Sequence, residues 1–191
     1  FTGEGTTHNG EKCLIPFDAD PTKDYSFYTI KEMYSNLEKI KNMPYVGEVT
    51  IFMDVDFNNP SFQQNLVKVV KEDENLEKKK KKKKKKKNAE EPVVKTPLDL
   101  KPPDGITAFY ASNTTQLSYN HPQTDNGIFT YYLLRGMKGE ADNGDKNVTV
   151  AELHDYISKN VTDTTSKLYE DLPQIPQLFT SNPDRVLFRL P

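Results

Sequence analysis

Apolar runs typical of strands buried on both faces constrain the fold of this chain more than any other feature. Three segments have this character: Glu48–Asp54 (EVTIFMD), Ile106–Ala111 (ITAFYA) and Arg185–Leu190 (RVLFRL). A strand that is apolar at nearly every position leaves no face for water, so both of its faces must be covered. We therefore expect three central strands in a sheet that has helices on both sides.

The segments between these runs carry the spacing of amphipathic helices. Apolar residues recur at helical intervals from Tyr28 to Ile40, and Ser61 can cap a second helix that continues through Val70. Further helices are expected over 128–137 and 150–168. Strands that alternate with helices predict an α/β fold of three layers, with a mostly parallel central sheet flanked by helices.

Two short motifs each end an apolar strand-like run, FTGEG at Phe1–Gly5 and MDVDFNN at Met53–Asn59. They resemble the catalytic motifs of the caspase and metacaspase family of cysteine peptidases, Ser-Gly-His-Gly and Asp-x-Cys-x-Ser-Gly. In this chain Glu4 stands where that family has its histidine, and Asp56 stands where it has its cysteine. The order and the apolar flanks of the motifs are kept, while both residues of the catalytic dyad are replaced.

The resemblance extends over nearly the whole chain. Four further segments match family segments in the same order along the chain. They are similar to the segment after the histidine loop, the stretch that lines the substrate pocket, a helix start and the last strand, and lie at Gly10–Pro21, Phe109–Tyr119, Gly127–Arg135 and Pro176–Leu190. The resemblance implies a caspase-like fold. The first two strands of that fold have no counterpart here, so we expect the chain to be an N-terminally truncated piece of a longer protein.

A low-complexity linker over 72–103 contains an unbroken run of ten lysines, Lys78–Lys87. It separates an N-terminal part, 1–71, from a C-terminal part, 104–191, of the same domain, and these parts resemble the large and small caspase subunits. The linker is either a processing site or an expanded repeat, which is tolerated because loop closure costs little per added residue.

Charge and hydropathy restrict the partners. The chain has 26 Lys and Arg against 28 Asp and Glu, so without the lysine run its net charge is about −12. The run has no interleaved aromatic residues, so we expect no nucleic-acid partner. No apolar stretch reaches the ~18 residues of a membrane span, so we expect no membrane partner either.

The chemistry of a caspase requires a thiolate nucleophile and an imidazole that activates it. A carboxylate such as Glu4 does not replace the imidazole near neutral pH, and Asp56 is a far poorer nucleophile than a thiolate. Three interpretations remain open: an inactive pseudopeptidase, two carboxylates that share a proton as in an acid protease, or a divalent cation site. The first is preferred because no second motif supports either of the others, and we expect neither a metal nor a cofactor.

The remaining cysteine and histidines give no substitute dyad. Cys13, the only cysteine, lies in an apolar run typical of a buried thiol. We expect His8 and His121 in loops and His154 on the solvated face of a helix, and none has the spacing of a metal-binding pair.

Two other segments have a candidate role. By its match to metacaspases, Asp54 would help to bind a basic substrate side chain, although a polar residue that merely ends a strand would look the same. If a substrate groove persists, Asp54, Ser112 and Gln116 are expected to line it. The segment 141–153 resembles a calcium loop but lacks the required glycine, and reads as a turn followed by a helix with a capping box.

The sequence therefore predicts a caspase-like domain without peptidase activity, acting as a regulatory or scaffold module that binds a protein or peptide. The alternative is an active endopeptidase of the caspase or metacaspase type. A single cysteine slightly favours a reducing compartment such as the cytoplasm. The oligomeric state does not follow from these patterns.

Overall fold

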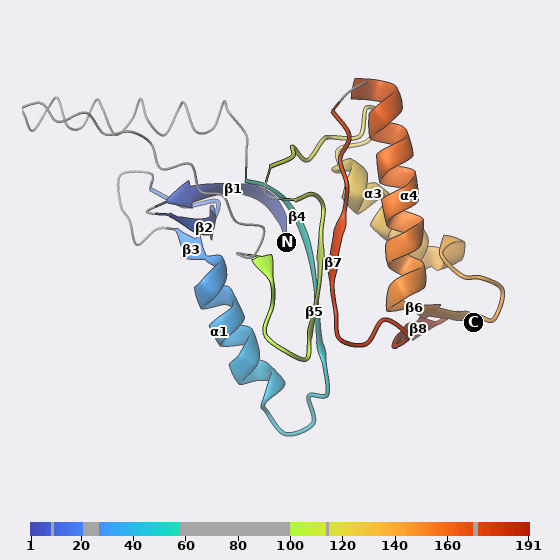
Figure 1. The fold of residues 1–191 in the computed structure, drawn as a ribbon, viewed down its shortest axis with the longest axis horizontal. Coiled ribbons are helices and arrows are strands. Elements are labelled where there is room, and N and C mark those ends of the chain that lie inside the picture. The colour runs from blue at the N-terminus through green and yellow to red at the C-terminus, as the bar shows by residue number, and fades with distance from the viewer. Residues whose placement is uncertain (9, 21–26, 58–99, 114, 170–171) are drawn as a thin grey trace, which may run out of the picture.

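A six-stranded sheet forms the centre of the molecule, with strand order β3-β2-β1-β4-β5-β7 (Figure 1). The computed structural model describes residues 1–8, 10–20, 27–57, 100–113, 115–169 and 172–191. The strands of this sheet are β1 (Thr2–His8), β2 (Glu11–Leu14), β3 (Tyr28–Thr29), β4 (Val49–Asp56), β5 (Ile106–Tyr110) and β7 (Gln177–Phe179).

The middle of the sheet is parallel and its flanks are antiparallel. β4 pairs in parallel with β1 on one side and with β5 on the other. β2 and β3 continue the sheet beyond β1 in antiparallel pairing, and β7 lies antiparallel to β5. The expected α/β fold with its parallel central strands is confirmed.

Helices cover both faces of the sheet, α1 (Ile30–Lys41) on one face and α3 (Ile128–Arg135) and α4 (Val150–Tyr169) on the other (Figure 1). β5 shows the alternation most clearly, because Ala108 and Tyr110 belong to the core beneath α1, whereas Phe109 belongs to the core beneath α3 and α4. All five residues of β5 are buried. This is the arrangement in three layers that the apolar runs predict.

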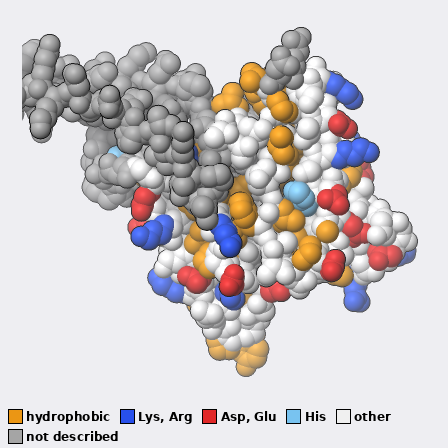
Figure 2. Space-filling view, viewed as in Figure 1, with side chains coloured by type: hydrophobic (Ala, Val, Ile, Leu, Met, Phe, Trp, Pro, Cys, Tyr) orange, Lys and Arg blue, Asp and Glu red, His pale blue; other side chains and the backbone are white. Residues whose placement is uncertain are grey.

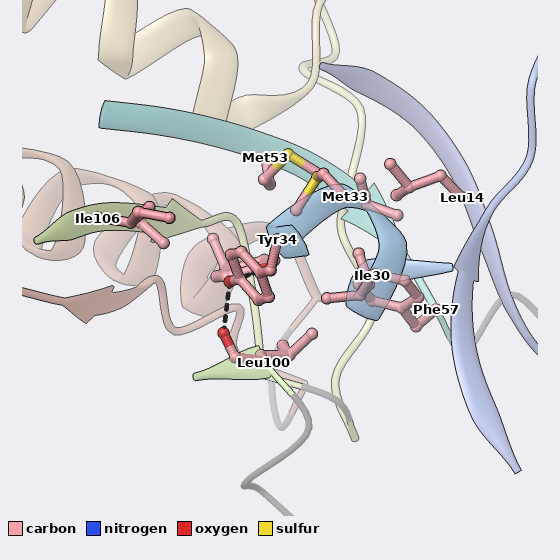
Figure 3. Packing of buried hydrophobic residues seen from close by; sticks show 11 residues of the cluster. Leu14, Ile30, Met33, Tyr34, Met53, Phe57, Leu100 and Ile106 are labelled. Atoms are coloured by element: carbon pink, nitrogen blue, oxygen red, sulfur yellow. Dashed lines mark hydrogen bonds between the residues drawn. The ribbon is translucent and has the colours of Figure 1, made fainter. Parts of the chain in front are cut away.

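The core beneath α1 joins this helix to β4 and β5 (Figure 3). Its apolar packing surrounds one polar chain: the Tyr34 hydroxyl donates to the Leu100 carbonyl oxygen at 2.6 Å and lies 2.6 Å from the Tyr110 hydroxyl. Since the Tyr34 proton is engaged by Leu100, Tyr110 donates to Tyr34. Burial raises the pKa of Tyr34 to about 12, so this phenol stays protonated and remains a hydrogen-bond donor at neutral pH.

Local sequence signals fix the starts of two helices. Thr29 and Glu32 form a capping box at α1, in which Thr29 Oγ1 accepts from the Glu32 amide at 3.0 Å and Glu32 accepts from the Thr29 amide at 3.1 Å. Thr149 and Glu152 form the same pair of bonds at α4, at 3.2 and 2.8 Å. The capping box expected at the end of the calcium-like segment is thus confirmed.

The last apolar run does not enter the central sheet, contrary to the sequence-based expectation. Its strand, β8 (Val186–Arg189), pairs antiparallel with β6 (Asn147–Thr149) in a separate two-stranded sheet. Its side chains are only partly covered, and β7 already occupies the position beside β5. The arginines at the two ends of the run indicate this exposure, because a doubly buried strand would not carry them.

The helix expected over 128–137 is shorter, since α3 ends at Arg135 and is followed by a wider turn, η3 (Gly136–Glu140). The helix expected after Ser61 and the lysine run Lys78–Lys87 lie outside the described residues. None of the helices in the described part of the chain is long and apolar enough to cross a membrane.

Candidate functional site

The two substituted dyad positions lie side by side where β1 and β4 last pair. Glu4 and Asp56 are direct register partners of these parallel strands. Register partners point to the same face of a sheet, about 4.8 Å apart in the backbone. Both residues are half-buried, and Asp56 is the last residue of β4. The pair therefore sits at the carboxyl end of β4, the edge at which open α/β sheets bind their ligands, while β1 continues past Glu4 to His8.

The face that carries this pair is the one covered by α3 and α4. Asp54 and Asp56 are two residues apart on β4 and so point the same way, and Asp54 contacts Thr130 of α3. Burial raises the pKa of Tyr119, and Tyr169 and Asp56 raise it further. Tyr119 also stacks on Tyr169, with ring centroids 4.0 Å apart.

Asp54 is buried, with 7% of its surface exposed, and both of its carboxylate oxygens accept hydrogen bonds. Oδ1 accepts from the Ser118 hydroxyl at 2.7 Å. Oδ2 accepts from the Thr130 hydroxyl at 2.5 Å and from the Thr130 amide at 3.2 Å. Thr130 is the third residue of α3. Asp54, on β4, therefore provides the hydrogen-bond acceptor that an N-cap side chain normally supplies to this amide.

The N-cap of α3 is Gly127, which has no side chain to cap the helix. A Cβ at this position would lie 2.2 Å from Asp54 Oδ2. The glycine thus allows the carboxylate of β4 to approach the first turn of α3, and the negative charge also suits the positive end of the helix dipole.

Ser112 and Gln116 lie in the segment that follows β5, and this segment also carries Ser118 and Tyr119. Ser112 is buried, and its hydroxyl donates weakly to the Gln116 carbonyl at 3.4 Å. The side-chain oxygen of Gln116 accepts from the Ile175 amide at 3.2 Å. The structure therefore brings the described residues of this segment, 112–113 and 115–119, near Asp54, which Ser118 contacts. Their role in a groove stays a prediction.

Gln174 is the residue of this region that the sequence pattern did not indicate. It is completely buried. Its amide nitrogen donates to the Ala111 carbonyl at 2.9 Å and to Ser118 Oγ at 3.4 Å, while its amide oxygen accepts from the Tyr119 amide at 3.0 Å. A glutamine between two prolines in an irregular segment carries no periodic signal, so only its unusual setting, PQIPQ, could have indicated a special role.

Cys13 is 1% exposed, as expected for a structural thiol. Burial raises the pKa of its thiol, which keeps it in the unreactive protonated form. The two predictions for His8 and His154 were wrong. His8 ends β1 in place of a loop and packs on Phe27 at 5.2 Å. His154 has 23% of its side chain exposed and faces Phe109, so it does not lie on a solvated face.

No group of three or more His, Cys, Asp or Glu side chains is placed to hold a metal ion among the described residues. Two open pockets in that part of the chain lie elsewhere. One is lined by α1 and the segment 101–104, and the other by 101–106 and 178–181. Both are near the amino end of β5, whereas Glu4 and Asp56 are at the carboxyl end of β4.

Chemically, this edge offers two neighbouring carboxylates on one face, together with the Ser118 hydroxyl beside Asp54. Carboxylates can accept hydrogen bonds and protons, but they cannot form the thioester that a cysteine peptidase passes through. Apolar side chains gather at the end of α4 that carries Tyr169, as Figure 2 shows. The exposed large apolar residues in this part of the sequence are Leu168, Leu172 and Ile175.

Comparison with known proteins supplies one match. A family model described as the caspase domain matches residues 1–188, nearly the full chain. A search of curated proteins found no match.

Proposed function

We propose that this chain, which belongs to the caspase-domain family, has no peptidase activity and acts by binding a protein or peptide partner as a regulatory or scaffold module. The observation that carries the proposal is the register pairing of Glu4 with Asp56. By the resemblance of their motifs, these positions correspond to the imidazole and the thiolate of the family, and here both hold carboxylates.

The replacement removes both chemical steps that peptide cleavage requires. Amide hydrolysis of this type needs a nucleophile that forms an acyl intermediate and an acid that protonates the leaving amine. Two adjacent carboxylates repel each other and supply neither an imidazolium nor a thiolate. Cys13 cannot take over the nucleophile's role, because it is buried and its pKa is raised.

The edge retains features that suit a binding site. Ser118, which lies near Ser112 and Gln116 in the chain, contacts Asp54, and the exposed Ile175 donates its amide to the Gln116 side chain, with the exposed Leu172 three residues before it. Aromatic and apolar side chains beside a few polar groups are typical of peptide-binding surfaces. Asp54 contributes from beneath this surface, through Ser118. The alternative function is an active endopeptidase of the caspase or metacaspase type.

Turnover of fluorogenic peptides with Arg, Lys or Asp at the cleaved position tests the proposal. We expect no turnover above that of an Asp56→Ala variant purified in the same way. Turnover that is present in the wild type and lost in Asp56→Ala would establish an active peptidase and overturn the proposal. Equal turnover in both preparations would identify a contaminant and leave the domain itself inactive, as proposed.

A second experiment tests the alignment of the two positions. The double variant Glu4→His with Asp56→Cys should place an imidazole next to a thiol, and an adjacent imidazolium lowers a thiol pKa. The new thiol should therefore react with iodoacetamide at pH 6 faster than Cys13 and faster than the thiol of the single variant Asp56→Cys. Equal rates in the double and single variants would show that the two side chains do not face each other.

A further inference from the structure

We propose that Gln174 is a positioning residue, which holds the segment 112–119 in place over Asp54 so that the binding surface is formed before a partner arrives. The inference rests on the proposed function only in assigning partner binding to this segment. The positioning itself follows from hydrogen bonds that can be tested without a partner.

Gln174 uses both ends of its amide to fix the segment. The side-chain nitrogen donates to the carbonyl of Ala111, the residue just before the segment, and the side-chain oxygen accepts from the Tyr119 amide at its end. Because the donor and the acceptor are held in one rigid amide plane, the two ends of the segment are held at a fixed separation. Packing of an apolar side chain at the same place would not select that separation.

The position of Gln174 is itself fixed by α4. The backbone N–H of Gln174 donates to Thr165 Oγ1 at 3.0 Å, and its backbone carbonyl accepts from the Thr162 hydroxyl at 3.2 Å. Thr165 is completely buried and donates in turn to the Val161 carbonyl one helical turn earlier. The helix thus acts as the rigid support, and Gln174 transfers its position to the segment.

Ser118 extends the same chain of hydrogen bonds to the central sheet. Its hydroxyl accepts weakly from Gln174 at 3.4 Å and donates to Asp54 at 2.7 Å. Tyr119 follows it, and the Tyr119 carbonyl accepts from the Ile128 amide at the start of α3 at 2.8 Å. Loss of the Gln174 amide should therefore loosen the segment and the entry of α3, while the sheet side of the molecule, with α1, is left intact.

Hydrogen exchange of the full chain, read at single amides by NMR, tests this directly. In Gln174→Leu, protection of the Tyr119 and Ile128 amides should fall about fivefold or more, since the loss of a buried hydrogen bond costs about 1 kcal/mol or more, which is a factor of about five. Protection in β2 and α1 should change less than about twofold. The matched control is Gln177→Leu, because the Gln177 side chain donates only to the neighbouring Ile175 and Pro176 carbonyls.

A pH profile separates positioning from mere filling of space. In Gln174→Glu, the introduced carboxyl group resembles the amide when it is protonated, since it can donate to the Ala111 carbonyl and accept from the Tyr119 amide. When it ionises, the donor is lost and a buried charge faces that carbonyl. Protection factors of the segment, corrected for intrinsic exchange, should therefore be close to wild type at low pH and fall as the pH rises. The wild type should show no such change.

The outcomes distinguish the two claims. A uniform loss of protection throughout Gln174→Leu, or a Gln174→Glu variant without pH dependence in the segment, would show that Gln174 only adds stability, and would overturn the inference. If Gln174→Leu does not fold, Ser118→Ala breaks the same chain nearer its end and should loosen the same amides. The absence of turnover bears on the proposed function alone, because exchange of the segment does not depend on catalysis.

Discussion

Replacing Asp54 by alanine should lower the free energy of unfolding by about 3–5 kcal/mol. Three donors converge on this buried carboxylate: the Ser118 hydroxyl, the Thr130 hydroxyl and the Thr130 amide. A hydrogen bond to a charged group contributes about 1.5–3 kcal/mol. The two hydroxyls can rotate toward other acceptors and recover part of this, but the amide is fixed in the first turn of α3. Loss of a negative charge at the helix N-terminus adds about 0.3–1 kcal/mol.

The measurement is urea unfolding at pH 7, followed by far-UV circular dichroism and analysed by linear extrapolation. Asp54→Asn is the matched control, because its carbonyl can still accept from Thr130 while its amide donates to the Ser118 oxygen. We expect this variant to lose only about 1–2 kcal/mol, since it keeps the geometry but not the charge. If Asp54→Ala lost less than about 1 kcal/mol, or if both variants lost the same amount, the carboxylate would not be the cap of α3.

Three further predictions follow from side chains described above. In urea unfolding, Gly127→Ala should destabilise the chain by about 2 kcal/mol or more, because the new methyl group meets the Asp54 carboxylate. The control is Gly47→Ala, whose methyl group would meet nothing within 4 Å. Its free energy of unfolding should stay within about 0.5 kcal/mol of wild type. Tyr34→Phe should lower the unfolding free energy by about 1–3 kcal/mol and by more than Tyr110→Phe, because only Tyr34→Phe leaves the Leu100 carbonyl without its donor. Burial lowers the pKa of His154, so protonation favours the unfolded chain, and its contribution to stability should be complete above pH 6.5 and decline below it. In His154→Gln, this part of the dependence of the urea midpoint on pH should be missing.

The residues that the sequence placed well are those whose signal is local. The amphipathic spacing of α1 and the Thr149–Glu152 capping box each depend on residues within a few positions, and both are confirmed. The pairing of Glu4 with Asp56 was also within reach, because the two motifs that resemble the family's dyad motifs follow each other on neighbouring strands, although β1 runs on past Glu4 to His8.

The errors and omissions involve partners far apart in the chain. The placement of Val186–Arg189 depends on whether β7 or β8 pairs with β5, and both are short apolar runs. The contacts of Asp54 with Thr130 span 76 residues, so no window of sequence contains them. Gln174 likewise bonds across 63 residues to Ala111. Hydrogen bonds of this kind are determined by the tertiary fold and have no periodic pattern from which they could be read.

The adjacency of β4 and β5 has a consequence for how the chain could be divided. These strands are nearest neighbours at the centre of the sheet, yet the whole stretch from Phe57 to Gly105 separates them in the sequence. Lengthening such a connection costs only ~0.6 kcal/mol per doubling, so the domain should tolerate an inserted protein there. Expressed separately, each half would carry a bare strand edge that invites aggregation, while the two together could cover each other. If the two halves are each fused to one of two interacting proteins, their reassembly across β4 and β5 should report the meeting of those partners.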